Sequence, residues 1–406
     1  MQVDIQGKIP AYVRNILDVL RQNGKRGYLV GGSLRDLLRG VIPHDFDLTT
    51  NAIPSEMLEI FKDFRIIPTG LAHGTLTVLS EGKPVEITTH RTDGAYSDSR
   101  HPDNVTFTPD LAADLARRDF TVNAMAWSEE TGLVDLFGGQ ADLANGILRA
   151  VGDPEKRFCE DALRILRCFR FSSQLDFTVE PETERAASLC ASRLGDIAIE
   201  RIFSELTRTV LGVAPERGFT LMQHAGCLPY IFFDISPDLT RLAALNILPK
   251  KAPLRMAALL HRETPEALRH LARRWHTPNA FSDSMCAYIA ALGEMIPESP
   301  YEARRFVCRH FPHFEGALLL RAALFGEDIE RALLLTQTVL KDGTAVELRR
   351  LAVNGKTLQE KVGVRVEKTA SLLACLQDIV WQDPAANRRD TLLAAAHHIC
   401  EKEEWL

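Results

Sequence analysis

The chain has no long uninterrupted run of apolar residues and no excess of positive charge. Its 406 residues include 48 Lys and Arg against 54 Asp and Glu, a net charge of −6. No stretch approaches the roughly 20 apolar residues of a membrane span, and the first residues lack the basic and apolar segments of a secretory signal. The acidic balance argues against nonspecific nucleic-acid binding, which relies on many cationic contacts to phosphates. Clustered arginines could still bind RNA.

The chain also lacks a Cys-x-x-Cys pair, an internal repeat and a low-complexity linker. Its eight cysteines are scattered, and Cys159, Cys168 and Cys190 lie in helical patterns. We therefore expect reduced, mostly buried thiols in a cytoplasmic protein with no membrane partner. Without a linker, domain boundaries can be placed only approximately.

Two kinds of hydrophobic pattern divide the chain, which is too long for one compact core. Up to about residue 145, helix signals at 11–22, 34–39 and 54–61 alternate with short strand signals. Beyond that point strand signals largely stop and helical patterns follow one another, beginning with 155–172. The sequence predicts an α+β head with a mixed sheet and an all-α remainder. The expected strands are 27–30, 45–48, 65–67, 75–79, 84–88 and 105–107.

Asp45 and Asp47 flank Phe46 just after the Gly31-Gly32-Ser33 segment. On a strand, residues two apart share a face, so these carboxylates would repel each other unless a divalent cation such as Mg²⁺ bound them. The glycine turn would let backbone N–H groups approach a phosphate beside a helix N-terminus. This combination suggests phosphoryl or nucleotidyl transfer, although isolated Asp-x-Asp pairs are often solvated turn residues.

Glu86 lies in a third strand pattern, Val85 to Thr89. A carboxylate on a strand next to the aspartates would complete a two-metal site. An exposed strand glutamate without any function fits the sequence equally well.

Arginines recur in two further segments. Arg117-Arg118-Asp119 could neutralise a triphosphate. Arg164, Arg167 and Arg170, spaced by three, would share a helix face, with Asp161 one turn before them. Asp161 could accept from an exocyclic amine while Arg164 donates to a ring acceptor, so the pair could select CTP and ATP over UTP and GTP. The alternative without any function is that the first segment is a solvated basic turn and the second a surface helix with ion pairs.

Taken together, five ordered motifs resemble the class II tRNA nucleotidyltransferases, the bacterial CCA-adding enzymes and their poly(A) polymerase relatives. The motifs are 31–33, 45–47, the loop 91–102, 117–119 and 160–164, and the resemblance is dense over residues 28 to 210. It implies a nucleotidyltransferase (polymerase beta-like) head at 1–145, a helical neck with a nucleotide-reading helix at 146–213, a helical body at 214–310 and a tRNA-binding helical tail at 311–406.

The resemblance also implies residue roles. The metal ligands would be Asp45 and Asp47, with Glu86 as a further catalytic carboxylate and Mg²⁺ as the cofactor. The nucleotide would contact the following residues, of which Asp161 and Arg164 would read the base: Gly32, Ser33, Arg35, Arg118, Asp161, Arg164, Arg167 and Arg170.

The reaction implied is template-independent addition of CCA to the tRNA 3′ end from CTP and ATP, with release of pyrophosphate. Alternatives within the family are A-adding, CC-adding and poly(A)-synthesising enzymes; the intact loop 91–102, our candidate for the CTP-to-ATP switch, argues against CC addition. A catalytically silent RNA-binding protein is an alternative of a different class, and it would predict a missing carboxylate. The sequence is compatible with a monomer or a homodimer.

Overall fold

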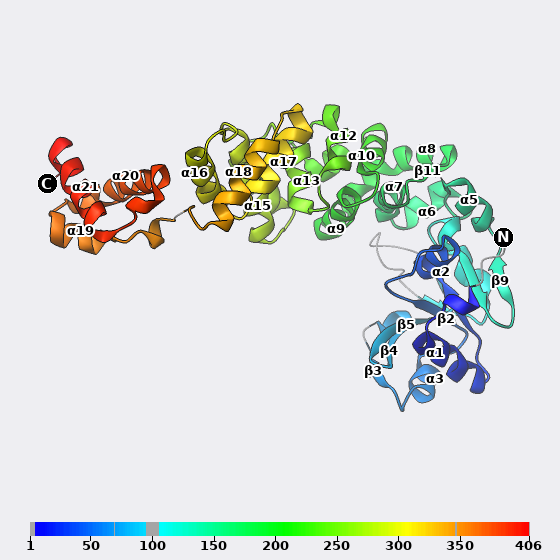
Figure 1. Ribbon diagram of the computed structural model, residues 1–406. Coiled ribbons are helices and arrows are strands. Elements are labelled where there is room, and N and C mark those ends of the chain that lie inside the picture. The colour runs from blue at the N-terminus through cyan, green and yellow to red at the C-terminus, as the bar shows by residue number, and fades with distance from the viewer. Residues whose placement is uncertain (1–4, 69, 95–104, 346, 406) are drawn as a thin grey trace. The chain divides into compact units, whose positions relative to one another are not determined.

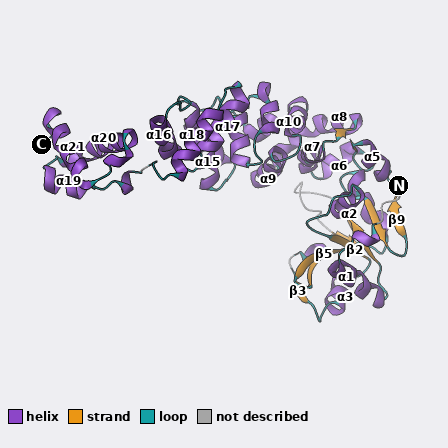
Figure 2. Ribbon diagram, viewed as in Figure 1, coloured by secondary structure: helices purple, strands orange, loops and turns teal. Residues whose placement is uncertain are grey.

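The computed structural model describes residues 5–68, 70–94, 105–345 and 347–405, and it divides into two compact units, Met1–Leu239 and Thr240–Leu406. Within the described residues, strands gather in the first unit and the second unit is helical (Figures 1 and 2). The predicted α+β class is therefore confirmed. The finer division at 145, 213 and 310 stays a prediction.

The N-terminal part of the first unit contains a mixed sheet (Figure 1). β2 and β5 are parallel, and the other neighbouring strands are antiparallel. In spatial order its seven described strands are β3 (Arg65–Ile67), β4 (Thr75–Ser80), β5 (Lys83–Thr89), β2 (Asp47–Thr50), β1 (Gly27–Val30), β8 (Met125–Ser128) and β9 (Gly132–Asp135).

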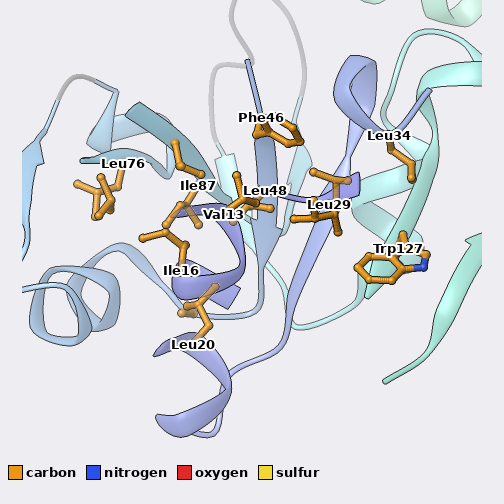
Figure 3. Close-up of a cluster of buried hydrophobic side chains, with 14 of the residues drawn as sticks. Val13, Ile16, Leu20, Leu29, Leu34, Phe46, Leu48, Leu76, Ile87 and Trp127 are labelled. Atoms are coloured by element: carbon orange, nitrogen blue, oxygen red, sulfur yellow. The ribbon is translucent and has the colours of Figure 1, made fainter. Parts of the chain in front are cut away.

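One face of this sheet packs on α1 (Ala11–Gln22). Val13, Ile16 and Leu20 repeat at helical spacing and are fully buried against side chains such as Leu48 and Ile87 (Figure 3). In β5 the buried Val85 and Ile87 alternate with exposed Glu86. The sheet thus places apolar side chains on the α1 side and Glu86 on the opposite side.

Two predicted boundaries near the aspartates are wrong. The helix expected from Leu34 begins at Gly31, so Gly31-Gly32-Ser33 is the first turn of α2 (Gly31–Leu38). The strand expected from Asp45 begins at Asp47, and Asp45 lies in a preceding bend. The reason is the register: Val30, the last residue of β1, pairs with Asp47, so β1 has no residue left to pair with Asp45.

A helical segment follows the sheet within the first unit. The helix predicted over 155–172 is interrupted, because Asp161 is extended (φ −141°, ψ 103°) between α6 (Pro154–Glu160) and α7 (Leu163–Leu175). The short parallel pair β10 (Ile147–Leu148) and β11 (Thr178–Val179) was not expected from local patterns. Helices α9 (Ile199–Val210) and α10 (Pro215–His224) pack on α7. The unit further contains β6 (Arg91–Asp93), β7 (Val105–Phe107), α4 (Leu111–Ala116), α5 (Gly139–Asn145), α8 (Pro181–Cys190) and α11 (Leu228–Phe232).

The second unit consists of packed helices. Its last part has its own core, in which Leu358, Leu376 and Leu392 are fully buried. Among the described residues no helix has the length and apolar character needed to cross a membrane. The helices are α12 (Ala243–Ile247), α13 (Ala252–Leu259), α14 (Pro265–Arg274), α15 (Asn279–Leu292), α16 (Pro300–His310), α17 (Phe314–Phe325), α18 (Glu330–Lys341), α19 (Gly355–Val362), α20 (Thr369–Gln382) and α21 (Arg389–Lys402).

Candidate active site

Asp47 and Glu86 are register partners on the parallel strands β2 and β5. Partners in a sheet point to the same face, so the carboxylate beside Asp47 in the sheet is Glu86, and Asp45 approaches from the bend. Burial raises the pKa of Asp47, and the negative charges of Glu86 and Asp45 raise it further, whereas Arg118 lowers it. Glu86 and Asp45 therefore both act electrostatically on Asp47, although Asp45 and Asp47 do not lie side by side on a strand as predicted.

These carboxylates fit a hard divalent cation. None of the three forms an ion pair with another described side chain, and Arg118 offsets only part of the effect that burial and the neighbouring carboxylates have on Asp47. Their oxygen atoms are the ligand type that Mg²⁺ prefers. The described residues nevertheless contain no group of three His, Cys, Asp or Glu side chains at metal-binding spacing. The metal roles of Asp45 and Asp47 stay predictions.

The first turn of α2 borders the carboxylates. Gly31 has a φ of +68°, and a Cβ atom there would lie 3.4 Å from Nη1 of Arg118 and 3.6 Å from Oδ2 of Asp47. A side chain would therefore fill the space between the arginine and the aspartate. Ser33 is buried and turned inward: its hydroxyl donates to Val30 O at 2.8 Å and accepts from the Asp47 N–H at 3.4 Å. It positions Asp47 and does not line the cavity described below.

Arg117 and Arg118 are held by Asp114, a residue that the sequence reasoning missed. Asp114 is fully buried, and its two oxygens accept from Arg117 Nη2 at 2.8 Å and Arg118 Nη2 at 3.1 Å. Burial alone would raise the pKa of Asp114, but the two guanidinium groups keep it below its usual value. The three- and four-residue spacings to the arginines at the end of α4 are the signal that could have identified it.

A hydrogen-bonded chain joins α7 to α2. Arg167 donates to Asp119 Oδ2, Asn123 Nδ2 donates to Asp119 Oδ1 at 3.2 Å, and Arg35 Nη1 donates to Asn123 Oδ1 at 2.8 Å. Burial would raise the pKa of Asp119, but Arg167 and the hydrogen bonds hold it far below its usual range. Asp119 and Asn123 are thus positioning residues, and the sequence alone did not identify these roles.

Asp161 and Arg164 do not form the helical pair that the sequence predicted. Asp161 Oδ1 accepts from the Leu163 N–H at 3.0 Å, at the start of α7, and Oδ2 accepts from Arg201 Nη2 at 3.1 Å. Arg164 bonds Glu160 Oε2 at 2.6 Å and the backbone oxygens of Arg157 and Arg117 at 3.2 and 3.3 Å. Each side chain is fixed by partners of its own.

A cavity of about 570 Å³ in the first unit brings most of the predicted residues together. The face of Phe171 lies against three arginines, with guanidinium carbons 4.1, 5.3 and 5.6 Å from the ring centroid for Arg170, Arg35 and Arg167. Glu86 lies instead in an adjoining cavity of about 270 Å³ that Asp47 and Arg118 also line. The predicted residues on the larger cavity are Gly32, Arg35, Asp47, Arg118, Asp161, Arg164, Arg167 and Arg170.

Arg170 also has a structural partner. Its side chain is 6% exposed and lies 3.0 Å from Glu205 of α9, which is equally buried. Burial lowers the pKa of Arg170 to about 10, against the opposite effect of Glu205. The predicted loop 91–102 lies outside the described residues from Ala95 onward, and its beginning forms β6, paired with β7.

Comparison with known proteins places the chain in a family. Residues 27–149 match the family described as the poly A polymerase head domain, and residues 176–241 match a probable RNA- and SrmB-binding site of polymerase A. The CCA-adding enzyme of Lactiplantibacillus plantarum is 35% identical over 397 residues, covering 96% of both chains. The chain belongs to the CCA-adding enzymes. A second member, from Levilactobacillus brevis, is 46% identical over 233 residues, which span 57% of this chain and 58% of that enzyme.

Solved structures of CCA-adding enzymes share the fold. The Bacillus stearothermophilus CCA-adding enzyme in complex with CTP has a TM-score of 0.82, 29% identity and coverage of 98% of this chain and 99% of that one. A tRNA nucleotidyltransferase complexed with a primer tRNA and an incoming ATP analog has a TM-score of 0.64 at 22% identity, covering 81% and 99%. That second likeness concerns the fold alone.

Proposed function

We propose that this CCA-adding enzyme extends the 3′ end of tRNA by two cytidylates and one adenylate, using CTP and ATP and releasing pyrophosphate. The observation that carries the proposal is the shared cavity: Asp47 from the sheet, Arg118 after α4, and Asp161 and Arg164 at the α6–α7 junction all line it. Carboxylate, phosphate-binding and base-reading groups thus surround a space of nucleotide size.

The groups at the α2 end of the cavity would bind the phosphates. The N-terminal turn of α2 offers backbone N–H groups and the positive end of the helix dipole. Arg118, held by Asp114, stands beside Gly31 and adds a cationic donor. These groups would hold the triphosphate and stabilise the negative charge that develops when the tRNA 3′-hydroxyl attacks the α-phosphate.

Asp45 and Asp47 would hold the divalent cation, for which we propose Mg²⁺, with Glu86 beside them. Such an ion, when bound, lowers the pKa of the attacking hydroxyl and stabilises the leaving pyrophosphate. The carboxylates also give this part of the site a negative charge, which would repel the triphosphate unless a cation neutralised it. We therefore expect the nucleotide and the metal ion to bind together.

Base reading would use those donor and acceptor sites of Arg164 and Asp161 that are not already bonded to protein groups. A guanidinium has five N–H donors and a carboxylate has about four acceptor sites. Arg164 uses three donors on protein oxygens and Asp161 uses two acceptor sites on N–H groups. Cytosine and adenine present an amine beside a ring acceptor, which matches the unused acceptor sites of Asp161 and the unused donors of Arg164. Uracil and guanine would leave buried groups unpaired, which disfavours them by about 10⁴-fold.

The direct test offers the purified protein a tRNA that lacks its last three nucleotides, with CTP, with ATP or with both. CCA addition gives two added nucleotides with CTP alone and three with both. One nucleotide added from ATP, and only to a tRNA that already ends in CC, would indicate an A-adding enzyme. Two nucleotides from CTP and none from ATP would indicate a CC-adding enzyme, and a long ladder poly(A) synthesis. No extension of either tRNA would favour the silent RNA-binding alternative. A cytoplasmic location and a monomeric or dimeric state remain predictions.

A further inference from the structure

Two thiols are in contact near the α6–α7 junction, and neither lines the cavity. Cys159 is on the last turn of α6 and Cys190 is the last residue of α8, and their sulfur atoms are 3.9 Å apart. Both are free thiols; Cys159 is partly exposed and Cys190 is buried. The helices that carry them pack directly on each other.

The position of Cys159 connects this pair to the base-reading residues. Its neighbour Glu160 accepts from Arg164 at 2.6 Å and forms an ion pair with Arg157 at 3.0 Å. The next residue, Asp161, is the extended residue that separates α6 from α7. A displacement at the end of α6 is therefore transmitted to Arg164 through an ion pair and to Asp161 through the backbone.

We infer that Cys159 and Cys190 are a redox modification site, at which a reversible disulfide forms and restrains the junction between α6 and α7. The sulfur atoms would have to approach from 3.9 Å to about 2.05 Å, the length of a disulfide bond. Because the two thiols sit at the ends of their helices, part of this movement falls on the junction itself.

The oxidant that we specify is a small-molecule disulfide, with glutathione disulfide as the probe. The Cys159 thiolate attacks one of its sulfur atoms, forming a mixed disulfide and releasing one glutathione thiolate. Cys190 then loses its proton to solvent and attacks the Cys159 sulfur, which forms the protein disulfide and releases the second glutathione. In total the protein loses two hydrogen atoms and one glutathione disulfide becomes two glutathione thiols.

The order of these steps follows from accessibility. Burial raises the pKa of Cys190 to about 11, and the nearby Cys159 contributes in the same direction. Cys190 therefore stays a protonated thiol until the mixed disulfide brings an electrophilic sulfur beside it, whereas Cys159 can meet a solvent oxidant first. Transient disulfides of this kind are the usual form in reducing compartments.

Peptide mapping tests the site itself. The full-length protein is equilibrated with glutathione disulfide, alkylated, digested without reduction and analysed by mass spectrometry. We expect a Cys159–Cys190 linked peptide that dithiothreitol reverses, and a Cys190→Ser variant in which Cys159 instead retains glutathione. Cys375→Ser, which removes a partly exposed thiol of the second unit, should leave the link intact. A wild-type protein that accumulates glutathione on Cys159, or links either cysteine elsewhere, would overturn the inference.

CTP binding tests the restraint, and this second step rests on the proposed function. Calorimetric titration should show CTP affinity about threefold or more weaker in the oxidised protein, because the base-reading groups are displaced from their binding geometry. The affinity should return with dithiothreitol, and it should not change in oxidised Cys190→Ser. Equal affinities in a fully linked protein would overturn the restraint. Reduced protein that fails to bind CTP would count against the proposed function, while the linked peptide still decides the thiol site.

Discussion

Arg167 donates both Nε and Nη2 to a single oxygen of Asp119, at 2.9 and 2.5 Å, across 48 positions of the sequence. Asp119 also accepts from Asn123, which in turn accepts from Arg35. Asp119 thus holds the arginine of α7 directly and is linked through Asn123 to the arginine of α2, which Asp36 also binds at 2.9 Å. Both arginines line the same cavity. The orientation of Arg167, which we propose binds the nucleotide, therefore depends on Asp119.

Replacing this carboxylate should affect stability and nucleotide binding together. We expect Asp119→Asn to lower the free energy of unfolding by about 2 kcal/mol, below the range for fully buried pairs because Arg167 is 35% exposed. The KM for CTP should rise as well, since Arg167 loses the carboxylate that orients it and Asn123, which accepts from Arg35, loses one of its partners. Urea unfolding and primer-extension kinetics measure the two effects. Asp176→Asn, which removes an exposed ion pair with Arg217, is the matched control and should change stability by less than about 1 kcal/mol.

Replacing Asp47 should impair activity without lowering stability. Asp47→Asn should reduce nucleotide transfer by about 10³-fold or more, as expected when charge stabilisation at the reacting phosphate is lost. In metal-free buffer its unfolding midpoint should equal or exceed that of the wild type. The raised pKa of Asp47 means that its negative charge is unfavourable in the folded state at neutral pH, so removing the charge relieves repulsion.

A separate measurement tests metal binding without activity. Millimolar Mg²⁺ should raise the melting temperature of the wild type, because binding to the native state alone stabilises it. The increase should shrink in Asp47→Asn and stay intact in Lys62→Ala, which alters an exposed pair with Glu59. Equal increases in all three proteins would remove Asp47 from the metal site.

Base choice should shift predictably at Asp161. Asp161→Asn keeps the side-chain shape but replaces an acceptor with an N–H₂ donor, which matches the carbonyl of uracil. We expect the ratio of kcat/KM for CTP to that for UTP to fall by about tenfold or more. Asp161→Ala should impair both nucleotides, since it also removes the bonds to Arg201 and to the first N–H of α7. An unchanged ratio in Asp161→Asn would contradict base reading by this residue.

Arginine pairs of the second unit are candidate sites for binding the tRNA phosphates. Arg304 Nη1 bonds the Trp381 backbone oxygen at 2.6 Å, so its replacement would also disturb packing. The cleaner variant changes Arg273, Arg274, Arg349 and Arg350 to alanine. We expect weaker tRNA binding and a shallower dependence of log K on log salt, by roughly one unit for each phosphate that the variant no longer neutralises. A slope equal to that of the wild type would place these arginines outside the interface.

Local patterns were enough to predict most elements of the first unit. Alternating or continuous apolar residues identified β1, β4 and β5, and the helical spacing of Val13, Ile16 and Leu20 identified α1 with its observed limits. Each of these signals depends only on neighbours within one element. The errors occurred where distant pairing decides: β2 begins at Asp47 because β1 ends at Val30.

The same division holds for the site. By itself the sequence determined the fold class and the family resemblance, because hydrophobic patterns and ordered motifs carry that information, and the resemblance implied eight of the residues that line the cavity. Only the tertiary structure decided that Glu86 is the sheet partner of Asp47, that Asp161 separates two helices and accepts from the first N–H of the second, and that Asp114 and Asp119 bind arginines of the cavity. These relationships depend on strand register and helix packing, which are set by burial and hydrogen bonding between segments far apart in the chain.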